Sequence, residues 1–244
     1  GKPVIVGGLP GRLQATGRGV SWATKLGCEK LLGISIKNAE IVLQGFGNVG
    51  RYTAYFLQEM GARIIAVQDI GGAIYNKKGL DIEKLFKHCP ASKDTVKGFS
   101  EAEEISADEF FSLECDTFIP AAMENVITEK TAPKLKAKMV VEGANDPTAE
   151  DGEKILLDRG IIVLPDFFAN SGGVIASYVE WRNAKSGNQT SEEEVYEIID
   201  EKIENTFFDG LKKKEELRCR SFREAFFSLA LNSLIDAMRA RLWI

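Results

Sequence analysis

The sequence predicts an α/β protein with a doubly wound, mostly parallel, Rossmann-like sheet and extra helices at its C-terminus. Short apolar segments alternate along the chain with segments whose apolar residues recur at helical spacing. One apolar segment runs directly into a GxGxxG motif that opens a helix, the order typical of dinucleotide-binding units. We see no two-residue turns of the β-hairpin type between the strands, which favours parallel pairing.

Size and composition are ordinary for a globular protein. The 244 residues allow one large domain or two small ones, and 44% of them are hydrophobic and 27% charged. The net charge of −5 provides no general attraction to nucleic acid or to anionic membranes. No segment has the length of a membrane span or the pattern of a signal peptide. We therefore expect a cytoplasmic protein with neither a nucleic-acid nor a membrane partner.

The first elements lead up to the central motif. Residues 1–11 are rich in glycine and proline and predict an irregular segment. Residues 15–32 predict a helix that places Val20, Ala23 and Leu31 on one face. Residues 39–43 are mainly apolar and predict a short buried strand.

The motif QGFGNVG at residues 44–50 follows that strand and opens a helix with apolar residues up to position 60. Gly45 permits a tight turn, Gly47 lets the backbone approach a pyrophosphate, and Gly50 lets helix and strand pack closely. The free N–H groups at the helix start then face the phosphates. The motif residues are candidate cofactor contacts: Gly45, Phe46, Gly47, Asn48, Val49 and Gly50.

A second strand, residues 62–68, ends at Asp69, which lies 19 positions beyond Gly50. An acid at this place can accept a hydrogen bond from the ribose 2′-hydroxyl and repels a 2′-phosphate. Asp69 and Ile70 are therefore candidate cofactor contacts, and NAD is the favoured cofactor. NADP remains possible, because Gly71, Gly72 and neighbouring lysines can also influence the choice.

The remaining segments continue the alternation of strands and helices. Residues 71–79 predict a small hairpin or an irregular excursion, Asp81 caps a short helix through Phe86, and residues 100–112 predict a loop and a short helix. Strands are expected at 115–120, 138–142 and 160–165, and a crossover helix at 148–159. Small or polar residues follow these strands, at the edge where open α/β sheets bind ligands: Ala121, Ala122, Gly143, Asn145 and Asn170.

The C-terminal part is helical. Ser191 and Glu194 form a capping box before a helix with Val195, Ile199 and Phe207 on one face. A last helix begins near Arg223. These apolar faces predict core packing or contact with another domain.

The sequence shows no residues arranged for acid–base, nucleophilic or metal-dependent catalysis. The one histidine, His88, lies in a polar stretch and is expected at the surface. The four cysteines are scattered without metal-like spacing and are expected to be reduced and mostly packed. We therefore assign no catalytic residue and no metal site, and expect the acid–base groups on polypeptide outside this chain.

Several motifs together resemble one family closely, the glutamate/leucine/phenylalanine/valine dehydrogenases, and in particular the cofactor-binding domain of the glutamate dehydrogenases. The resemblance extends over essentially the whole chain, up to the ending MRARLW. The matching stretches are residues 1–3, 15–20, 44–50, 120–122, 141–145, 170–174 and 177–181.

The resemblance implies roles for individual residues. Thr16 and Asn48 would contact the nicotinamide cofactor, and Asn145 and Asn170 would lie near its nicotinamide ribose and ring. Ser177 matches the position that hydrogen-bonds the side-chain carboxylate of glutamate. A hydroxyl can donate to that carboxylate, so Ser177 favours glutamate and 2-oxoglutarate as substrates.

Two departures from the family pattern are evident. Gln14 stands where an acidic residue is usual. The N-terminal domain, which in the family carries the catalytic Lys and Asp and most hexamer contacts, is absent. We expect residues 1–190 to form the nucleotide-binding domain and residues 191–244 to pack on it or on the absent domain. The chain should then be an excised part of a homo-hexameric enzyme, inactive alone.

Two alternatives stay open at this point. The chain could be a stand-alone dinucleotide-binding module, although such a module has no use for a substrate-carboxylate contact such as Ser177. It could also be the cofactor domain of a dehydrogenase acting on leucine, phenylalanine or a similar amino acid.

Overall fold

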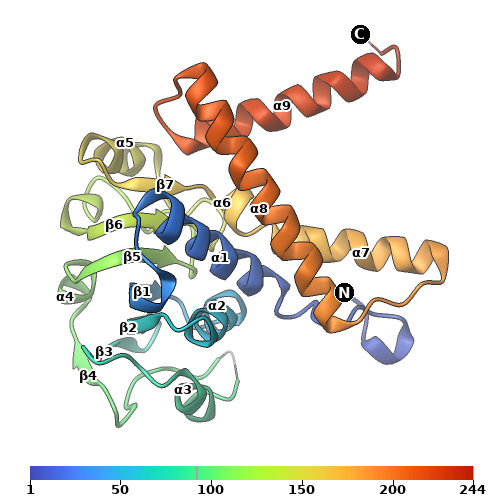
Figure 1. Ribbon diagram of the computed structural model, residues 1–244. Helices are drawn as coiled ribbons and strands as arrows, with labels where there is room; N and C mark the ends of the chain where they lie inside the picture. Colours follow the sequence, from blue (N-terminus) through green and yellow to red (C-terminus); the bar gives the residue numbers. More distant parts are fainter. Residues whose placement is uncertain (92, 244) are drawn as a thin grey trace.

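The computed structural model describes residues 1–91 and 93–243 and centres on one seven-stranded sheet (Figure 1). The strand order is β4-β3-β2-β1-β5-β6-β7. The strands are β1 (Glu40–Gln44), β2 (Arg63–Asp69), β3 (Gly72–Tyr75), β4 (Glu103–Ile105), β5 (Glu114–Pro120), β6 (Lys136–Val141) and β7 (Ile162–Leu164).

Five strands, β2, β1, β5, β6 and β7, pair in parallel. The chain starts at β1, adds β2 on one side, and later returns to add β5 on the other side. The direction of winding therefore reverses beside β1, and such a switch point forms a ligand-binding crevice in open α/β sheets. The predicted doubly wound, mostly parallel sheet is confirmed.

The edge formed by β3 and β4 is antiparallel. Asp69 pairs with Gly72, so residues 70 and 71 form the two-residue hairpin turn between β2 and β3. The expectation that the chain has no such turn was wrong. Residues 71–79 were expected to form a small hairpin or an irregular excursion; residues 72–75 instead form one strand, β3, whose hairpin partner is β2. The segment 100–112 was expected to contain a loop and a short helix; its residues 103–105 instead form strand β4, which is mostly exposed and lacks an apolar alternation.

The helices lie largely where their periodicity and caps predict them. They are α1 (Ala15–Leu26), α2 (Asn48–Glu59), α3 (Ile82–His88), α4 (Ala107–Phe111), α5 (Glu150–Asp158), α6 (Asp166–Ala169), α7 (Gly172–Ser186), α8 (Glu192–Leu217) and α9 (Phe222–Ala240). The first predicted helix is divided, since a π-helical segment, η2 (Gly27–Leu31), continues α1. Short 3-10 turns are η1 (Val4–Val6), η3 (Ile36–Asn38) and η4 (Ala132–Lys134). Asp81 caps α3 and the Ser191–Glu194 capping box starts α8, as predicted.

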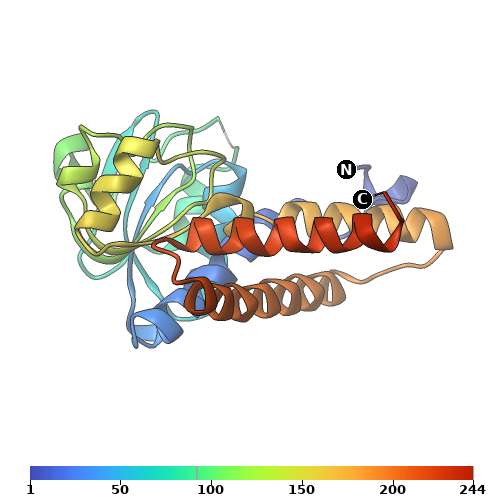
Figure 2. The same ribbon diagram turned by 90° about the horizontal axis from the view of Figure 1, so that it is seen from above.

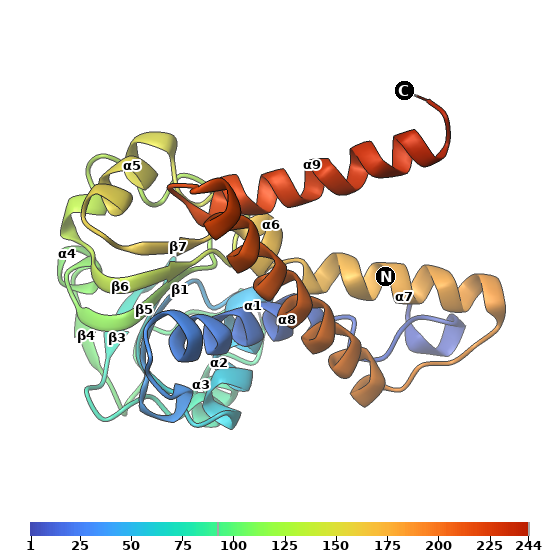
Figure 3. The same cartoon turned by 45° about the horizontal axis from the view of Figure 1, so that its top comes forward.

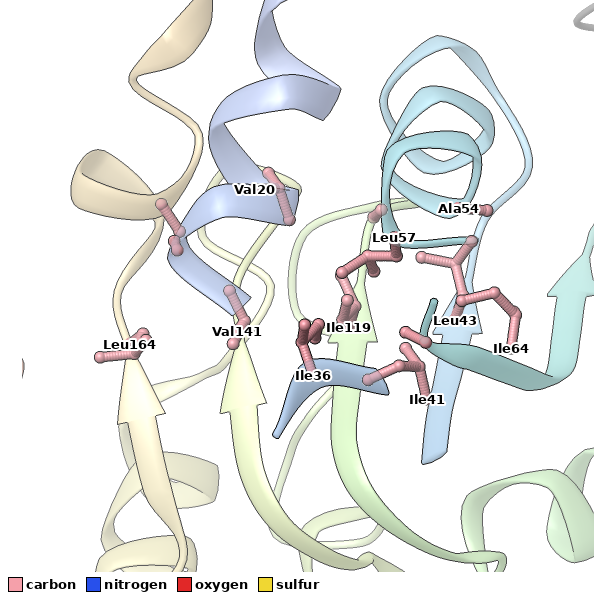
Figure 4. Packing of buried hydrophobic residues seen from close by; sticks show 14 of the residues in the cluster. Val20, Ile36, Ile41, Leu43, Ala54, Leu57, Ile64, Ile119, Val141 and Leu164 are labelled. Carbon is pink, nitrogen blue, oxygen red and sulfur yellow. The ribbon is translucent and has the colours of Figure 1, made fainter. Parts of the chain in front are cut away.

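Both faces of the sheet are buried, because successive strand residues point to opposite sides. Ile41 and Leu43 of β1 pack with Leu57 on the face covered by α1 and α2, whereas Val42 packs with Phe118 on the face covered by α4 and α5. Figure 4 shows the first of these layers. Short apolar strands therefore have the composition expected for a sheet covered by helices on both sides.

Three long helices extend beyond the sheet. α8 buries Val195, Ile199, Ile203 and Phe207 in the same core cluster as the strands. α7 and α9 run outward from the body of the sheet and diverge from each other (Figures 1 and 3). None of the helices in residues 1–91 and 93–243 is both long enough and apolar enough to cross a membrane.

Candidate functional site

The loops after β1, β5 and β6 are each hydrogen-bonded to the end of a neighbouring strand. The Gly45 N–H donates to the Gln68 carbonyl at 2.6 Å, and the Ala121 N–H to the Gln44 carbonyl at 2.7 Å. The Gly143 N–H donates to the Pro120 carbonyl at 3.0 Å. The carboxyl ends of β2, β1, β5 and β6 thus form one continuous edge, on which the predicted residues after these strands are brought together.

The three glycines of the motif have different surroundings, as their predicted roles require. Gly45 has φ +100°, and a Cβ there would lie 2.6 Å from the Ala121 carbonyl oxygen. A Cβ at Gly50 would overlap the Gly45 carbonyl oxygen. Around a Cβ built at Gly47, in contrast, the described residues leave open space to 4 Å. Close backbone approach from outside is therefore possible at Gly47.

Gly47 is also the N-cap of α2 and has no side chain to cover the N–H groups of the first turn. Such groups, together with the helix dipole, stabilise an anion. The side chains of Phe46 and Val49 face inward: Phe46 is buried against Phe86, with ring centroids 5.8 Å apart, and Val49 is half-buried. These two candidate residues can offer a ligand their backbone but little of their side chains.

Asp69 is held firmly at the end of β2. Its Oδ1 accepts from the Gly71 N–H at 2.8 Å and its Oδ2 from the Val96 N–H at 2.7 Å. Each carboxylate oxygen can accept a second hydrogen bond. Beside it, Ile70 is 97% exposed, and Met123 beyond Ala121 and Ala122 is 67% exposed. Two apolar side chains therefore border the edge on which the acid lies.

Asn145 and Asn170, predicted from separate strand exits, contact each other directly. The Asn170 Nδ2 donates to the Asn145 Oδ1 at 2.8 Å. It also lies 3.4 Å from the carbonyl oxygens of Gly143 and Ala144. The structure thus brings these two predicted residues together at the far end of the edge from Asp69.

Ser177 lies on the second turn of α7, beside a residue that the sequence reasoning missed. The Arg12 Nη2 donates to the Ser177 Oγ at 2.7 Å, and that hydroxyl donates to the Gly173 carbonyl at 3.0 Å. Thr16 packs at the same place, since a Cβ at Gly173 would lie 2.5 Å from the Thr16 Oγ1. The sequence signal was available: Arg12 is a lone cation between residues 3 and 17 of an apolar, glycine-rich stretch.

Asn48 connects this cluster with the central motif. Its Nδ2 donates to the Leu13 carbonyl at 2.9 Å, on the segment between Arg12 and Thr16. The candidate residues therefore occupy one side of the molecule, from Asp69 past the motif to Ser177.

Arg51 is a second residue that the sequence reasoning missed. It is buried (7% exposed), and its Nη2 donates to the carbonyl oxygens of Cys89 at 2.9 Å and Ala91 at 3.1 Å. The guanidinium also lies over the rings of Phe46 and Phe86. Arg51 thus anchors the start of the loop whose Val96 N–H holds Asp69.

A charged cluster that includes Glu142 and Arg223 lies at the loop after β6. Glu142 is fully buried, and burial raises the pKa of its carboxyl above the usual range, although the facing Arg223 guanidinium offsets part of this effect. Glu142 Oε2 accepts from the Asp166 N–H at 2.8 Å. This pair links the exits of β6 and β7.

Three features outside this edge are relevant to possible further sites: the histidine, groups of metal-ligand side chains, and a cavity beside α2. His88 is exposed, as predicted, and its Nε2 lies 3.0 Å from the Lys97 carbonyl oxygen. The described residues contain no group of three His, Cys, Asp or Glu side chains arranged to hold a metal ion. A cavity of about 820 Å³ beside α2 is lined by aromatic residues such as Tyr52, Phe56 and Tyr196, and shares no residue with the predicted site.

Comparison with known proteins gives a consistent result. The family model described as Glutamate/Leucine/Phenylalanine/Valine dehydrogenase matches residues 7–241. The NADP-specific glutamate dehydrogenase of Saccharolobus shibatae is 42% identical over 99% of this chain. The cryptic catabolic NAD-specific glutamate dehydrogenase of Bacillus subtilis is 40% identical over the whole chain. The chain spans 57% and 56% of the length of these two relatives.

Solved structures of glutamate dehydrogenases resemble the fold of this chain over almost its whole length. The glutamate dehydrogenase of Peptoniphilus asaccharolyticus matches 100% of this chain with a TM-score of 0.85 and 35% identity. The Leu-bound, hetero-hexameric glutamate dehydrogenase of Thermus thermophilus matches 99% of it with a TM-score of 0.87 and 29% identity. This chain spans 57% and 56% of those two chains, respectively.

Proposed function

The chain belongs to the glutamate/leucine/phenylalanine/valine dehydrogenase family, and on this premise we propose that it forms the cofactor-binding part of an NAD(P)-dependent glutamate dehydrogenase. That enzyme converts L-glutamate, NAD(P)⁺ and water to 2-oxoglutarate, ammonia and NAD(P)H. The observation that carries the proposal is the edge itself, where Gly47 leaves open space at the start of α2 while Gly45 and Gly50 are tightly packed.

The dinucleotide would lie along this edge. The pyrophosphate would approach Gly47 and the first turn of α2, because backbone N–H groups there stabilise negative charge. Asp69 would accept from the adenosine ribose, with Ile70 and Ala121–Ala122 beside the adenine. The nicotinamide end would reach Asn145 and Asn170, with Thr16 and Asn48 on its other side. Hydride transfer is the chemistry that the cofactor supplies.

The substrate would be held by Ser177 together with Arg12. A guanidinium makes charge-assisted hydrogen bonds to a carboxylate, so the pair suits the side-chain carboxylate of glutamate. An apolar amino acid would offer no carboxylate to the Arg12 guanidinium, whose charge would then keep only the Ser177 hydroxyl as a partner, which is costly in a desolvated cleft. Arg12 already donates to Ser177 at 2.7 Å and is therefore preorganised for this role.

The remaining parts of the enzyme would complete the site. The relatives above are longer than this chain, and we place the catalytic Lys and Asp of the family on polypeptide outside these 244 residues. Residues 1–190 would form the nucleotide-binding domain. Residues 191–244 would pack on it and, through the exposed apolar side of α9, on the rest of the enzyme. We further propose a homo-hexamer located in the cytoplasm.

We propose NAD as the preferred cofactor, because the Asp69 carboxylate accepts readily from a ribose hydroxyl and repels a 2′-phosphate. Calorimetric titration of the chain with NADH and with NADPH tests this choice. NADH should bind more tightly than NADPH. Asp69→Asn should reduce the ratio of the two affinities by about tenfold, since it removes a negative charge next to the 2′-phosphate of NADPH.

Asp108→Asn serves as the matched control. Asp108 is an exposed carboxylate of α4 that pairs with Lys134, away from the proposed cofactor site. It should leave both affinities unchanged. A preference for NADPH in the unaltered chain would overturn the cofactor choice, and binding of neither dinucleotide would overturn the proposed cofactor site.

A further inference from the structure

Helix α9 begins beside the carboxyl edge of the sheet and then runs away from it (Figures 1 and 3). Its first turn carries Arg223, which faces three carboxylates. The Nη2 donates to both oxygens of Glu142, at 2.9 and 2.8 Å. The Nε donates to Glu153 at 2.6 Å and the Nη1 to Asp166 at 3.3 Å. One side chain of α9 therefore joins α5 to the exits of β6 and β7.

One of these residues, Asp166, also holds the backbone next to the asparagine pair. Asp166 Oδ2 accepts from the Asp146 N–H at 2.8 Å, directly after Asn145. The Asn170 N–H donates to the Asp166 carbonyl, also at 2.8 Å. Arg223 contacts the Asp166 carboxylate, and Asp166 accepts hydrogen bonds from the backbone of Asp146 and of Asn170. Arg223 is therefore connected to both asparagines through a single residue, Asp166.

Apolar packing attaches α9 at the same place. The Phe226 ring stacks on Phe168 of α6, with centroids 4.3 Å apart and an interplanar angle of 8°. Phe168 lies two residues before Asn170. Arg223 and Phe226 are three positions apart and so project from one face of α9. The start of α9 is thus joined to α6 by both charge and packing.

We propose that Arg223 is a positioning residue for the nicotinamide end of the dinucleotide, an inference that rests on the function proposed above. Arg223 holds the two loops so that Asn145 and Asn170 stay in contact, and it does so without touching the dinucleotide. The adenosine end has different supports, since Asp69 is held by the N–H groups of Gly71 and Val96. Loss of Arg223 should therefore weaken binding at one end only.

The test compares NADH with ADP, which contains the adenosine and the pyrophosphate but neither the nicotinamide nor its ribose. Both are titrated calorimetrically into the 244-residue chain. Arg223→Met should weaken NADH binding about tenfold, a coupling of the size carried by side-chain networks. ADP binding should change less than about twofold, because its proposed contacts are with Asp69 and the first turn of α2, away from the two asparagines.

A second variant covers the case in which Arg223→Met unfolds the chain by leaving Glu142 buried without a positive partner. The double variant E142Q/R223M removes both charges of that pair and still lacks the link to Asp166, so it should show the same selective loss. Arg220→Ala is the control, because Arg220 pairs with Asp158 at the surface and should change neither affinity.

The outcomes separate the two proposals. Selective loss of NADH binding in the folded variant supports the positioning role. Equal losses for both ligands, or no loss, overturn it while the cofactor site stands. If the unaltered chain binds neither ligand, the proposed function fails and this inference fails with it.

Discussion

Burial decides the chemistry of single residues in this chain, and the cysteines illustrate it. Cys28 and Cys89 are buried, and desolvation raises the pKa of each thiol to about 11. Burial also raises the pKa of the Cys115 thiol. Cys219, in the turn before α9, is half-exposed. Because the thiolate is the reactive form, three of the four thiols should be inert at neutral pH.

Native alkylation should therefore modify Cys219 first. At pH 8 a thiol with a pKa near 11 is ionised in only about one molecule in a thousand. Iodoacetamide treatment followed by peptide mass mapping should show Cys219 modified while Cys28, Cys89 and Cys115 remain free. The denatured chain is the control and should react at all four. Fast reaction of Cys28 in the native chain would contradict the burial described here.

At the scale of elements, close contact between a strand, a turn and a helix builds the proposed phosphate site. β1 and α2 are joined by a turn in which Gly45 contacts Ala121 and Gly50 contacts Gly45. Neither glycine has room for a side chain. Gly47 lies between them in open space and has φ −74°, which any residue can adopt. The turn and the first turn of α2 together therefore contain two structural glycines and one that a ligand can approach.

Substitution by alanine should separate these roles. Gly50→Ala should destabilise the chain by about 1–3 kcal/mol or more, because the methyl group overlaps the Gly45 carbonyl oxygen. Gly47→Ala should change stability by less than about 1 kcal/mol. It should still weaken NADH binding at least tenfold, because the methyl group would occupy the place proposed for the pyrophosphate. Urea unfolding and calorimetric titration measure the two effects. Tight NADH binding by Gly47→Ala would place the phosphates elsewhere.

At the scale of the whole molecule, α9 has two different halves. Its first turns bury Phe222, Ala225 and Phe226 against α6 and α8. Further along, Phe227, Leu231 and Leu234 are 51%, 55% and 58% exposed. Figure 2 shows the outer part of the helix extending beyond the sheet. The first half therefore contributes to the core of this chain, and we propose that the second half packs on the rest of the enzyme.

This division predicts different effects of truncating side chains along α9. Phe226→Ala should lower the free energy of unfolding by about 3–5 kcal/mol, as for other buried aromatic residues. Leu231→Ala should change it by less than about 0.5 kcal/mol, as for exposed positions. Urea unfolding at low protein concentration gives both values. A large loss for Leu231→Ala would mean that another surface covers the outer half of α9 in solution.

The elements with local signatures were predictable from the sequence. The strands β1, β2, β5, β6 and β7, the GxGxxG turn, and the caps at Asp81 and Ser191 depend on residues close together in the chain. Period-2 and period-3.6 patterns and capping side chains act over a few residues, so they leave a readable pattern. The roles proposed for Asp69, Asn145, Asn170 and Ser177 remain predictions for binding experiments.

Tertiary structure alone decided the contacts between distant parts of the chain. β3 and β4 form an antiparallel edge although β4 has exposed, polar residues, because pairing with β3 and not its own composition makes it a strand. Arg12 meets Ser177, 165 residues away, and Arg223 meets Glu142, 81 residues away. The sequence determined the parallel strands, the motif and the family. Packing selected these long-range partners, because contacts between distant residues leave no local periodicity to read.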